Sequence, residues 1–228
     1  MNSALISLLH LTDPTLPIGG FSHSASLETY VQQGLVKDAA IAKDFVVQML
    51  SQNLKYTDAA FVSLAYDAAP KNDLQRLLLL DAECTAVKLP KEMRQASNKL
   101  GLRLMKIFQP LNKSELIDNY ATAIKNQVTI GHYCIAFALY AQALSISKQD
   151  ALNGFYYNAA VGFVTNAVKL VPLSQQSGQE ILFSIHNLID ELVQQTLDPN
   201  EDLIGLCCSG FDIKSMQHER LYSRLYMS

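Results

Sequence analysis

Residues 126–147 read Asn-Gln-Val-Thr-Ile-Gly-His-Tyr-Cys-Ile-Ala-Phe-Ala-Leu-Tyr-Ala-Gln-Ala-Leu-Ser-Ile-Ser, and residues 151–168 are likewise free of Asp, Glu, Lys and Arg. Each stretch is close to the roughly 20 residues of a membrane span. However, His132, Gln142, Asn158 and other polar residues interrupt them, and a bilayer core penalises polar side chains without partners. Because helices that are apolar on all sides normally lie inside a larger fold, we predict a buried central helical hairpin and no membrane insertion.

The rest of the chain places its apolar residues at helical rather than strand spacing. Five residues are expected to cap helix N-termini: Asp38, Asn72, Ser114, Ser147 and Ser174. One helix is expected from Ser174 to Asp198, and a short last helix from Asp212 through Met216. The sequence has no β-hairpin pattern, internal repeat or long linker. It therefore predicts an all-α fold, a single-domain helical bundle.

Within the single domain, residues 1–228, we distinguish an N-terminal segment and loop at 1–22 and a C-terminal partner-binding tail at 205–228. Hydrophobic residues make up 49% of the chain and charged residues only 17%. A chain with so many apolar residues is expected to expose hydrophobic surface, and we predict that a partner protein covers part of that surface. The net charge of -3 argues against nucleic acid as that partner.

The cysteines and the start of the chain indicate a compartment. Cys84, Cys134, Cys207 and Cys208 form neither a Cys-x-x-Cys motif nor a disulfide framework, which fits a reducing cytoplasm. The first residues lack the basic start of a secretory signal. We therefore expect a cytoplasmic protein.

Charges are divided unevenly along the chain. Lys and Arg side chains gather between residues 88 and 106, whereas residues 170–213 contain several Asp and Glu but no Lys or Arg. Two interpretations stay open at this point: the two segments are ordinary solvated faces, or their opposite fields orient docking with protein partners.

The sequence contains no phosphate-binding loop, dinucleotide-binding turn, nucleophile elbow or His-Glu-x-x-His motif. Ser22, His23, Ser24 and Glu28 are too close in sequence to form a Ser-His-acid triad, so we do not expect an enzyme. Thiolate and imidazole are suitable ligands for nickel, copper or zinc, and Cys208 with His218 is the candidate pair for a transient metal contact. The alternative function is a cytosolic thiol enzyme using Cys207, Cys208 and His218.

Residues 16–28, Leu-Pro-Ile-Gly-Gly-Phe-Ser-His-Ser-Ala-Ser-Leu-Glu, closely resemble the opening motif of the urease accessory protein UreF family. Residues 91–101, Lys-Glu-Met-Arg-Gln-Ala-Ser-Asn-Lys-Leu-Gly, resemble its Glu-x-Arg-x-x-Ser-x-x-x-Gly helix, and residues 167–175 resemble its Arg-Leu-x-Pro-Leu-x-Gln segment, with Lys169 in place of the Arg. Residues 212–228 resemble the tail of the family, with Tyr226 in place of a common Phe. The motifs occur in the right order over nearly the whole chain.

The resemblance implies a non-enzymatic, dimeric accessory protein of urease maturation. Proteins of this family act as an adaptor between UreD (also called UreH) and the GTPase UreG, which load nickel into apo-urease. No tightly bound cofactor is implied, although nickel in transit is possible. We expect the tail to be mobile alone and to become ordered on UreD.

The resemblance and the residue types assign two sets of site residues. Aromatic and Arg side chains tend to dominate protein interfaces, so the partner-binding set is Tyr222, Arg224, Leu225, Tyr226, His218, Glu219 and Lys169. A polar passage for nickel is expected along the opening motif, at Glu28, Ser22, Ser24 and Gly19.

Overall fold

The computed structural model describes residues 3–20, 23–206 and 208–226, and these form 12 α-helices and no strand. The helices are α1 (Ser3–Leu11), α2 (Leu27–Gln32), α3 (Ala39–Gln48), α4 (Asp58–Ala68), α5 (Leu74–Val87), α6 (Lys91–Phe108), α7 (Glu115–Lys125), α8 (Tyr133–Ala143), α9 (Lys148–Leu170), α10 (Gln175–Ser184), α11 (His186–Thr196) and α12 (Ser209–His218). A π-helical segment, Met49–Leu54, continues α3, and 3-10 turns lie at Ala69–Lys71 and Glu201–Leu203. The all-α prediction is confirmed.

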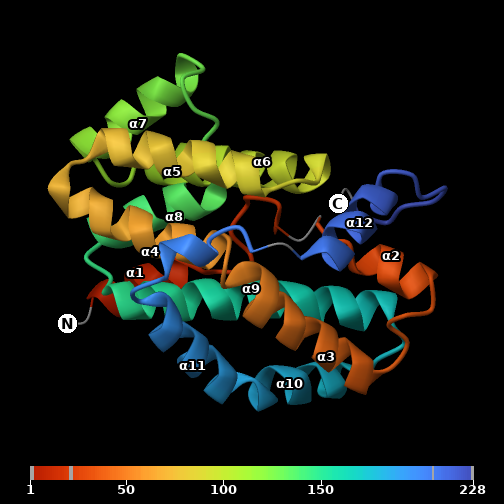
Figure 1. Ribbon diagram of the computed structural model, residues 1–228. Helices are drawn as coiled ribbons and strands as arrows, with labels where there is room; N and C mark the ends of the chain where they lie inside the picture. The colour runs from red at the N-terminus through yellow and green to blue at the C-terminus, as the bar shows by residue number, and fades with distance from the viewer. Residues whose placement is uncertain (1–2, 21–22, 207, 227–228) are drawn as a thin grey trace.

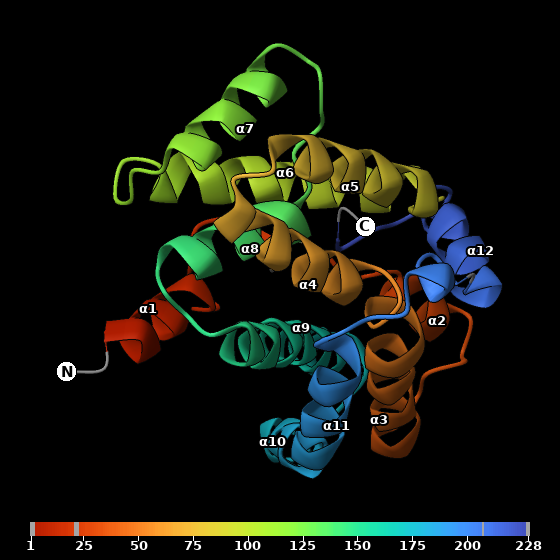
Figure 2. The ribbon, with the colours of Figure 1, turned by 60° about the vertical axis from the view of Figure 1, so that its left-hand side comes forward.

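The helices pack in layers around α8 (Figures 1 and 2). Helices α5, α6 and α7 lie on one side, and α9 with α3, α10 and α11 lies on the other. Helix α8 is held between α4 and α6, and its residues 134–141 are all buried. Residues 133–143 of the stretch without charges therefore form the core helix, as predicted, whereas residues 126–132 form a loop in which Val128 is exposed.

The second half of the predicted hairpin is less enclosed than expected. Helix α9 contacts α2, α3, α4, α10 and α11, but one side of it faces solvent, where Tyr157 is 47% exposed. The exposed residues of the uncharged stretch 151–168 are Tyr157, Gly162 and Thr165, so the absence of charge did not require burial. Among the described residues, no helix is long and apolar enough to cross a membrane.

Three of the predicted helix-capping residues are confirmed by their hydrogen bonds. Asp38, Ser147 and Ser174 each accept a hydrogen bond from a backbone N–H in the first turn of α3, α9 and α10. Ser114 precedes α7 without such a bond. The cap predicted at Asn72 is wrong: Asn72 has φ +53°, and Asp73 caps α5 instead.

Two predicted helices have different bounds. The helix expected from Ser174 to Asp198 is divided into α10 and α11, because Ile185 leaves helical geometry with φ −104° and ψ 6°. This break keeps Ile185 buried while both helices pack on α9. The last helix begins at Ser209, before Asp212, and ends at His218, beyond Met216.

The loop before α8 is fixed by one carboxylate. Asp81 of α5 is fully buried and accepts hydrogen bonds from the backbone N–H groups of Ile130 (2.9 Å), Gly131 (2.9 Å) and His132 (2.8 Å). The hydroxyls of Tyr120 and Thr129 also donate to it. Burial by itself would raise the pKa of Asp81, but these hydrogen bonds lower it overall.

Helix α6 approaches the same loop closely at Gly101. A Cβ atom at this position would lie 2.3 Å from the carbonyl oxygen of Gly131. One turn earlier, the Ser97 hydroxyl accepts from the Tyr133 N–H (3.3 Å) and pairs with His132 Nδ1 (3.0 Å). Arg94 donates to the carbonyl oxygens of Lys88 and Leu89 at the turn before α6. The Arg, Ser and Gly of the α6 motif therefore position this helix against α5 and α8.

Candidate partner-binding site

Helix α12 and residues 219–226, together called the C-terminal segment below, lie against α2 and α6 (Figures 1 and 2). The chain enters α2 through a sharp turn in which Ala25 and Ser26 have φ +48° and +64°. Left-handed backbone is uncommon for residues other than Gly. This turn places Glu28 in the first turn of α2, facing the C-terminal segment.

Glu28 is the buried anchor of the C-terminal segment. The residue is only 4% exposed. Its carboxylate accepts hydrogen bonds from the backbone N–H groups of Leu225 (2.7 Å) and Tyr226 (3.2 Å). A carboxylate that accepts backbone N–H groups forms charge-assisted hydrogen bonds, which are stronger than neutral ones. The end of the chain is thus attached to α2 through its backbone.

His218 joins two carboxylates. Its Nε2 lies 3.3 Å from Glu28 Oε2, and its Nδ1 lies 2.8 Å from Glu92 Oε2, in the first turn of α6. His218 is fully buried. Arg224 donates to the other oxygen of Glu92 at 2.6 Å. The cluster Glu28–His218–Glu92–Arg224 therefore connects α2, α6 and the C-terminal segment.

Further hydrogen bonds continue this contact along α2 and α12. The hydroxyls of Ser26 and Ser215 are 2.5 Å apart and buried. Gln32 donates to the carbonyl oxygen of Ser223 at 3.1 Å, and Gln33 pairs with Gln217 and Lys214. The structure thus shows the C-terminal segment packed on the body of the single chain.

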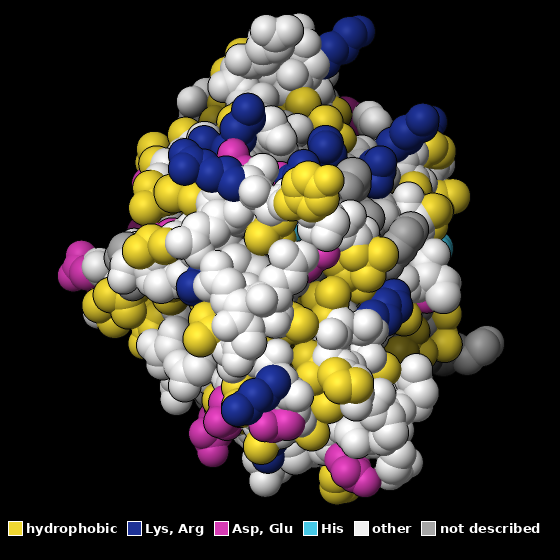
Figure 3. Space-filling model, turned by 90° about the vertical axis from the view of Figure 1, so that its right-hand side faces the viewer, with side chains coloured by type: hydrophobic (Ala, Val, Ile, Leu, Met, Phe, Trp, Pro, Cys, Tyr) yellow, Lys and Arg dark blue, Asp and Glu magenta, His cyan; other side chains and the backbone are white. Residues whose placement is uncertain are grey.

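The other side of the segment faces outward. Tyr222 is fully exposed and Leu225 is 70% exposed, and Glu219 is also exposed. Tyr226 is 7% exposed, and its hydroxyl has no hydrogen-bond partner among the described residues. Burial, together with the Glu28 carboxylate, raises the pKa of Tyr226. Figure 3 shows hydrophobic side chains on this face, below a group of Lys and Arg side chains at the level of α6.

The structure brings most of the residues that we predicted to bind partners close together. His218, Glu219, Tyr222, Arg224, Leu225 and Tyr226 share the C-terminal segment. Lys169 is exposed in the last turn of α9 and belongs to a different part of the surface. The sequence analysis missed Glu92, although it lies in the α6 motif, because nothing in one sequence shows that this carboxylate meets a histidine 126 positions away.

The candidate metal pair is not brought together. Cys208 precedes α12 and His218 ends it, and ten helical residues separate the two ends by about 15 Å. The Cys208 thiol donates to the carbonyl oxygen of Gln52 at 3.3 Å, while both ring nitrogens of His218 face carboxylates. Because Cys208 and His218 lie at opposite ends of α12, the alternative function, a thiol enzyme, would lack a contact between these two residues. Cys207 lies outside the described residues.

The residues predicted to form a polar passage lie in different environments. The Glu28 carboxylate is hydrogen-bonded to the C-terminal segment. Gly19 and Ser24 are buried, and Ser22 lies outside the described residues. A cavity of about 210 Å³ does begin at the opening motif, and its walls include Gly20, His23, Asp58, Lys88, Ser97, Asn158 and Asn166. A second hollow of about 140 Å³ shares Gly20, Asn158 and Asn166 with it.

Charged and titratable groups line the larger cavity. Burial, with the nearby Lys99 and Arg103, lowers the pKa of His23 to about 4, so this imidazole is neutral at pH 7. Lys88 Nζ and Asp58 Oδ2 form an ion pair at 2.5 Å, with side-chain exposures of 9% and 15%. Burial would raise the pKa of Asp58, but Lys88 lowers it overall. The cavity therefore has a few charged and polar groups on a mainly apolar wall.

Comparison with known proteins assigns the family. The family model described as UreF matches residues 36–186. The chain belongs to the UreF family. The urease accessory protein UreF of Actinobacillus pleuropneumoniae serotype 5b (strain L20) is 50% identical over 97% of this chain and 98% of its own length. The protein of the same name from Haemophilus influenzae (strain ATCC 51907 / DSM 11121 / KW20 / Rd) is 49% identical over 97% and 94%.

A more distant UreF relative matches the full length. The urease accessory protein UreF of Lachnoclostridium phytofermentans is 33% identical over 100% of both chains. The UreF model itself ends at residue 186, before α12. The match to this relative therefore covers the C-terminal segment, whereas the family model does not.

Proposed function

We propose that this chain acts as an adaptor in urease maturation, joining UreD/UreH to the GTPase UreG so that nickel reaches apo-urease. Membership of the UreF family makes it a urease accessory protein. In the adaptor role the chain offers surfaces to other proteins and carries out no catalysis itself. We place it in the cytoplasm as a homodimer, with nickel only in transit and no tightly bound cofactor.

One observation supports the C-terminal segment as the surface for UreD/UreH. Its inner side is attached by Glu28, His218 and Glu92, while its outer side presents Tyr222 and Leu225 to solvent. An exposed aromatic and an exposed Leu on a fixed backbone lose less conformational entropy on binding than the same residues on a free chain. The segment is thus preorganised for a protein partner.

Charge supports the same surface. Arg224 is partly exposed beside Glu92, and Figure 3 shows Lys and Arg side chains on the same face. A group of positive side chains beside apolar anchors fits a partner surface with an acidic patch. Lys169, at the end of α9, is proposed as a contact to a second partner because it lies apart from this segment.

Binding of purified UreD/UreH tests the proposal. The double variant Tyr222→Ala/Leu225→Ala removes the two anchors, and we expect affinity to fall at least about 30-fold, the scale of a hot spot of 2 kcal/mol. The matched control is Phe183→Ala on α10, which is 76% exposed and distant in sequence from the segment. Equal affinity of the double variant and the parent, or an equal loss in the control, would contradict this assignment.

A cellular measurement tests the adaptor role itself. Cells that carry the double variant should contain urease protein with little nickel and little activity, whereas the Phe183→Ala strain should resemble the parent. Normal nickel content in urease from cells that lack this chain altogether would overturn the proposed function.

A further inference from the structure

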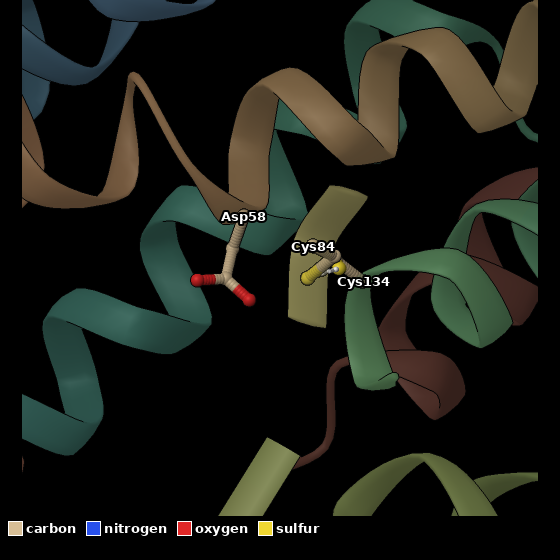
Figure 4. Close-up of side chains that lie close together, drawn as sticks. All are labelled: Asp58, Cys84 and Cys134. Carbon is tan, nitrogen blue, oxygen red and sulfur yellow. Dashed lines mark hydrogen bonds between the residues drawn. The ribbon is translucent and has the colours of Figure 1, made fainter. Parts of the chain in front are cut away.

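Three potential metal ligands meet beneath the cavity at the opening motif. Asp58 begins α4, Cys84 lies on α5 and Cys134 lies on α8 (Figure 4). Their ligand atoms lie within 4.8 Å of one another. Among the described residues, no other group of three or more His, Cys, Asp or Glu side chains lies close enough together to hold an ion. Figure 4 shows the two thiols side by side, with one carboxylate oxygen of Asp58 on their side and the other pointing away.

The sulfur atoms have nearly the separation that a tetrahedral ion requires. Cys84 Sγ and Cys134 Sγ are 3.6 Å apart. A tetrahedral ion bound about 2.3 Å from each of two sulfurs holds them about 3.8 Å apart. Both cysteines are fully buried and come from two packed helices, α5 and α8. The two sulfur ligands are therefore preorganised, and only the carboxylate has to turn toward them.

Lys88 makes ion binding an exchange of charge. The Lys88 ammonium is paired with Asp58, so a cation that takes Asp58 as a ligand has to displace Lys88 from this carboxylate. A divalent cation that binds as two thiol protons leave does not change the net charge of the group. Because Lys88 competes for Asp58, the ion would be held reversibly rather than as a permanent structural metal.

The site has a route to solvent. Asp58 and Lys88 form part of the wall of the cavity of about 210 Å³, and His23 of the opening motif lies on the same wall. Asp58 has a side-chain exposure of 15%. A cation in the cavity would therefore meet the carboxylate before it reached the buried sulfurs. The cavity is also large enough to provide water as a fourth ligand.

We propose that Asp58, Cys84 and Cys134 form a reversible binding site for a thiophilic divalent cation of the Zn²⁺ or Ni²⁺ type, with Lys88 holding Asp58 while the site is empty. Two sulfurs and one carboxylate select such ions over Mg²⁺ and Ca²⁺, which prefer oxygen ligands. The inference does not depend on the adaptor role, since the isolated chain suffices to bind the ion.

Cobalt titration of the reduced full-length chain tests the site, because Co²⁺ bound by thiolates absorbs in the near ultraviolet. Cys207→Ser/Cys208→Ser serves as the parent, so that only Cys84 and Cys134 remain. We expect one Co²⁺ per chain, a thiolate-to-cobalt absorption band, and displacement by Zn²⁺ but not by Mg²⁺. Adding Cys84→Ser or Cys134→Ser should abolish the band, with circular dichroism confirming the fold. Absence of the band in the parent, or its persistence in both Ser variants, would overturn the site.

Lys88→Met gives a second measurement that does not require a lost cysteine. Removing the competing ammonium should tighten Co²⁺ binding at least about tenfold and enlarge the rise in melting temperature that Zn²⁺ produces. Asp58→Asn should weaken binding by a similar factor. If Lys88→Met binds Co²⁺ more weakly than the parent, the lysine is a supporting group and the proposed exchange is wrong.

Discussion

Asp81 and Glu28 are two buried carboxylates that accept backbone N–H groups from a distant segment, and they differ in what they hold. Asp81 receives three backbone N–H groups and two hydroxyls from the loop before α8 and from α7. Glu28 receives two backbone N–H groups and one imidazole contact from the C-terminal segment. The loop held by Asp81 leads into the core helix, whereas the segment held by Glu28 has an exposed outer side.

The difference shows that the same bonding chemistry can build either a permanent element or a separable one. Releasing the loop at residues 129–132 would disturb α8, which α4 and α6 enclose. Releasing residues 219–226 would break the hydrogen bonds to Glu28 and the Arg224–Glu92 ion pair and would return conformational entropy to the chain. We therefore expect loss of Asp81 to affect global folding and loss of Glu28 to affect the C-terminal segment alone.

Asp81→Asn is expected to have the largest effect. The amide keeps the shape but offers one acceptor oxygen in place of two, so buried N–H groups lose their partner. We expect the free energy of unfolding to fall by about 3–4 kcal/mol in urea denaturation.

The pH dependence of stability provides a control for Asp81→Asn. The pKa of Asp81 is below its ordinary value of 3.8 in the folded state, so its contribution is present above that pH and is lost as pH falls through the lower folded value. Below pH 3.8, the parent should therefore lose stability more steeply than the variant. Parallel curves would show that Asp81 does not stabilise the fold as a charged group.

Gly101→Ala is expected to have the next largest effect. Its Cβ would lie 2.3 Å from the Gly131 carbonyl oxygen, so α6 or the loop must shift, at a cost of about 2–3 kcal/mol. Gly162→Ala on α9 is the matched control, since no heavy atom outside its chain neighbours and its own helix backbone lies within 4 Å of its Cβ position. It should raise stability by up to about 1 kcal/mol through helix propensity. Thermal unfolding that shows the same sign for both variants would exclude the close contact as the cause.

Glu28→Gln should act locally. The neutral amide accepts more weakly than the carboxylate and leaves one N–H of Leu225 or Tyr226 poorly paired. We expect amide hydrogen exchange at residues 219–226 to speed up about tenfold, equivalent to about 1.4 kcal/mol, with exchange at residues 130–132 unchanged. Faster exchange in both regions would mean that the C-terminal segment does not separate from the core. Fast exchange in the parent, slowed by UreD/UreH, would support the sequence-based expectation of a tail that is mobile alone.

Tyr226→Phe should have the smallest effect and a stabilising one. The buried Tyr226 hydroxyl has no partner among the described residues, and removing such a group should raise stability by up to about 1 kcal/mol. Tyr222→Phe is the control, because its ring is exposed and no change is expected. A lower melting temperature for Tyr226→Phe would show that the hydroxyl finds a hydrogen bond in solution.

Features decided by neighbouring residues could be predicted from the sequence. The uncharged run at 126–147 predicted the buried α8, and Ser147 predicted the start of α9 because a cap and its N–H lie three residues apart. The cap at Asn72 was wrong by one residue, since the sequence does not reveal which of Asn72 and Asp73 takes the left-handed backbone. The break at Ile185 follows from packing against α9 and has no local Gly or Pro signal.

The candidate site could be predicted only in part. The tail motif identified Tyr222, Arg224 and Tyr226. Their segment is attached to Glu28, which precedes Leu225 by 197 residues and Tyr226 by 198 residues in the sequence. Many carboxylates could accept those N–H groups equally well, so only the packing of α2 and α6 selects Glu28 and Glu92. The cluster of Asp58, Cys84 and Cys134 was missed for the same reason, because its three members come from three helices.

The attachment of Glu28 to Leu225 has a consequence for biosynthesis. A ribosome that adds about 5–20 residues per second needs about 10–40 s to pass from one partner to the other, which lie 197 positions apart. During that time the nascent polypeptide displays Glu28 without its backbone donors, and the hydroxyl of Ser26 without Ser215. This corner of the molecule can therefore assemble only after Leu225 has been synthesised, which gives a co-translational chaperone or a waiting partner subunit a defined interval in which to engage α2.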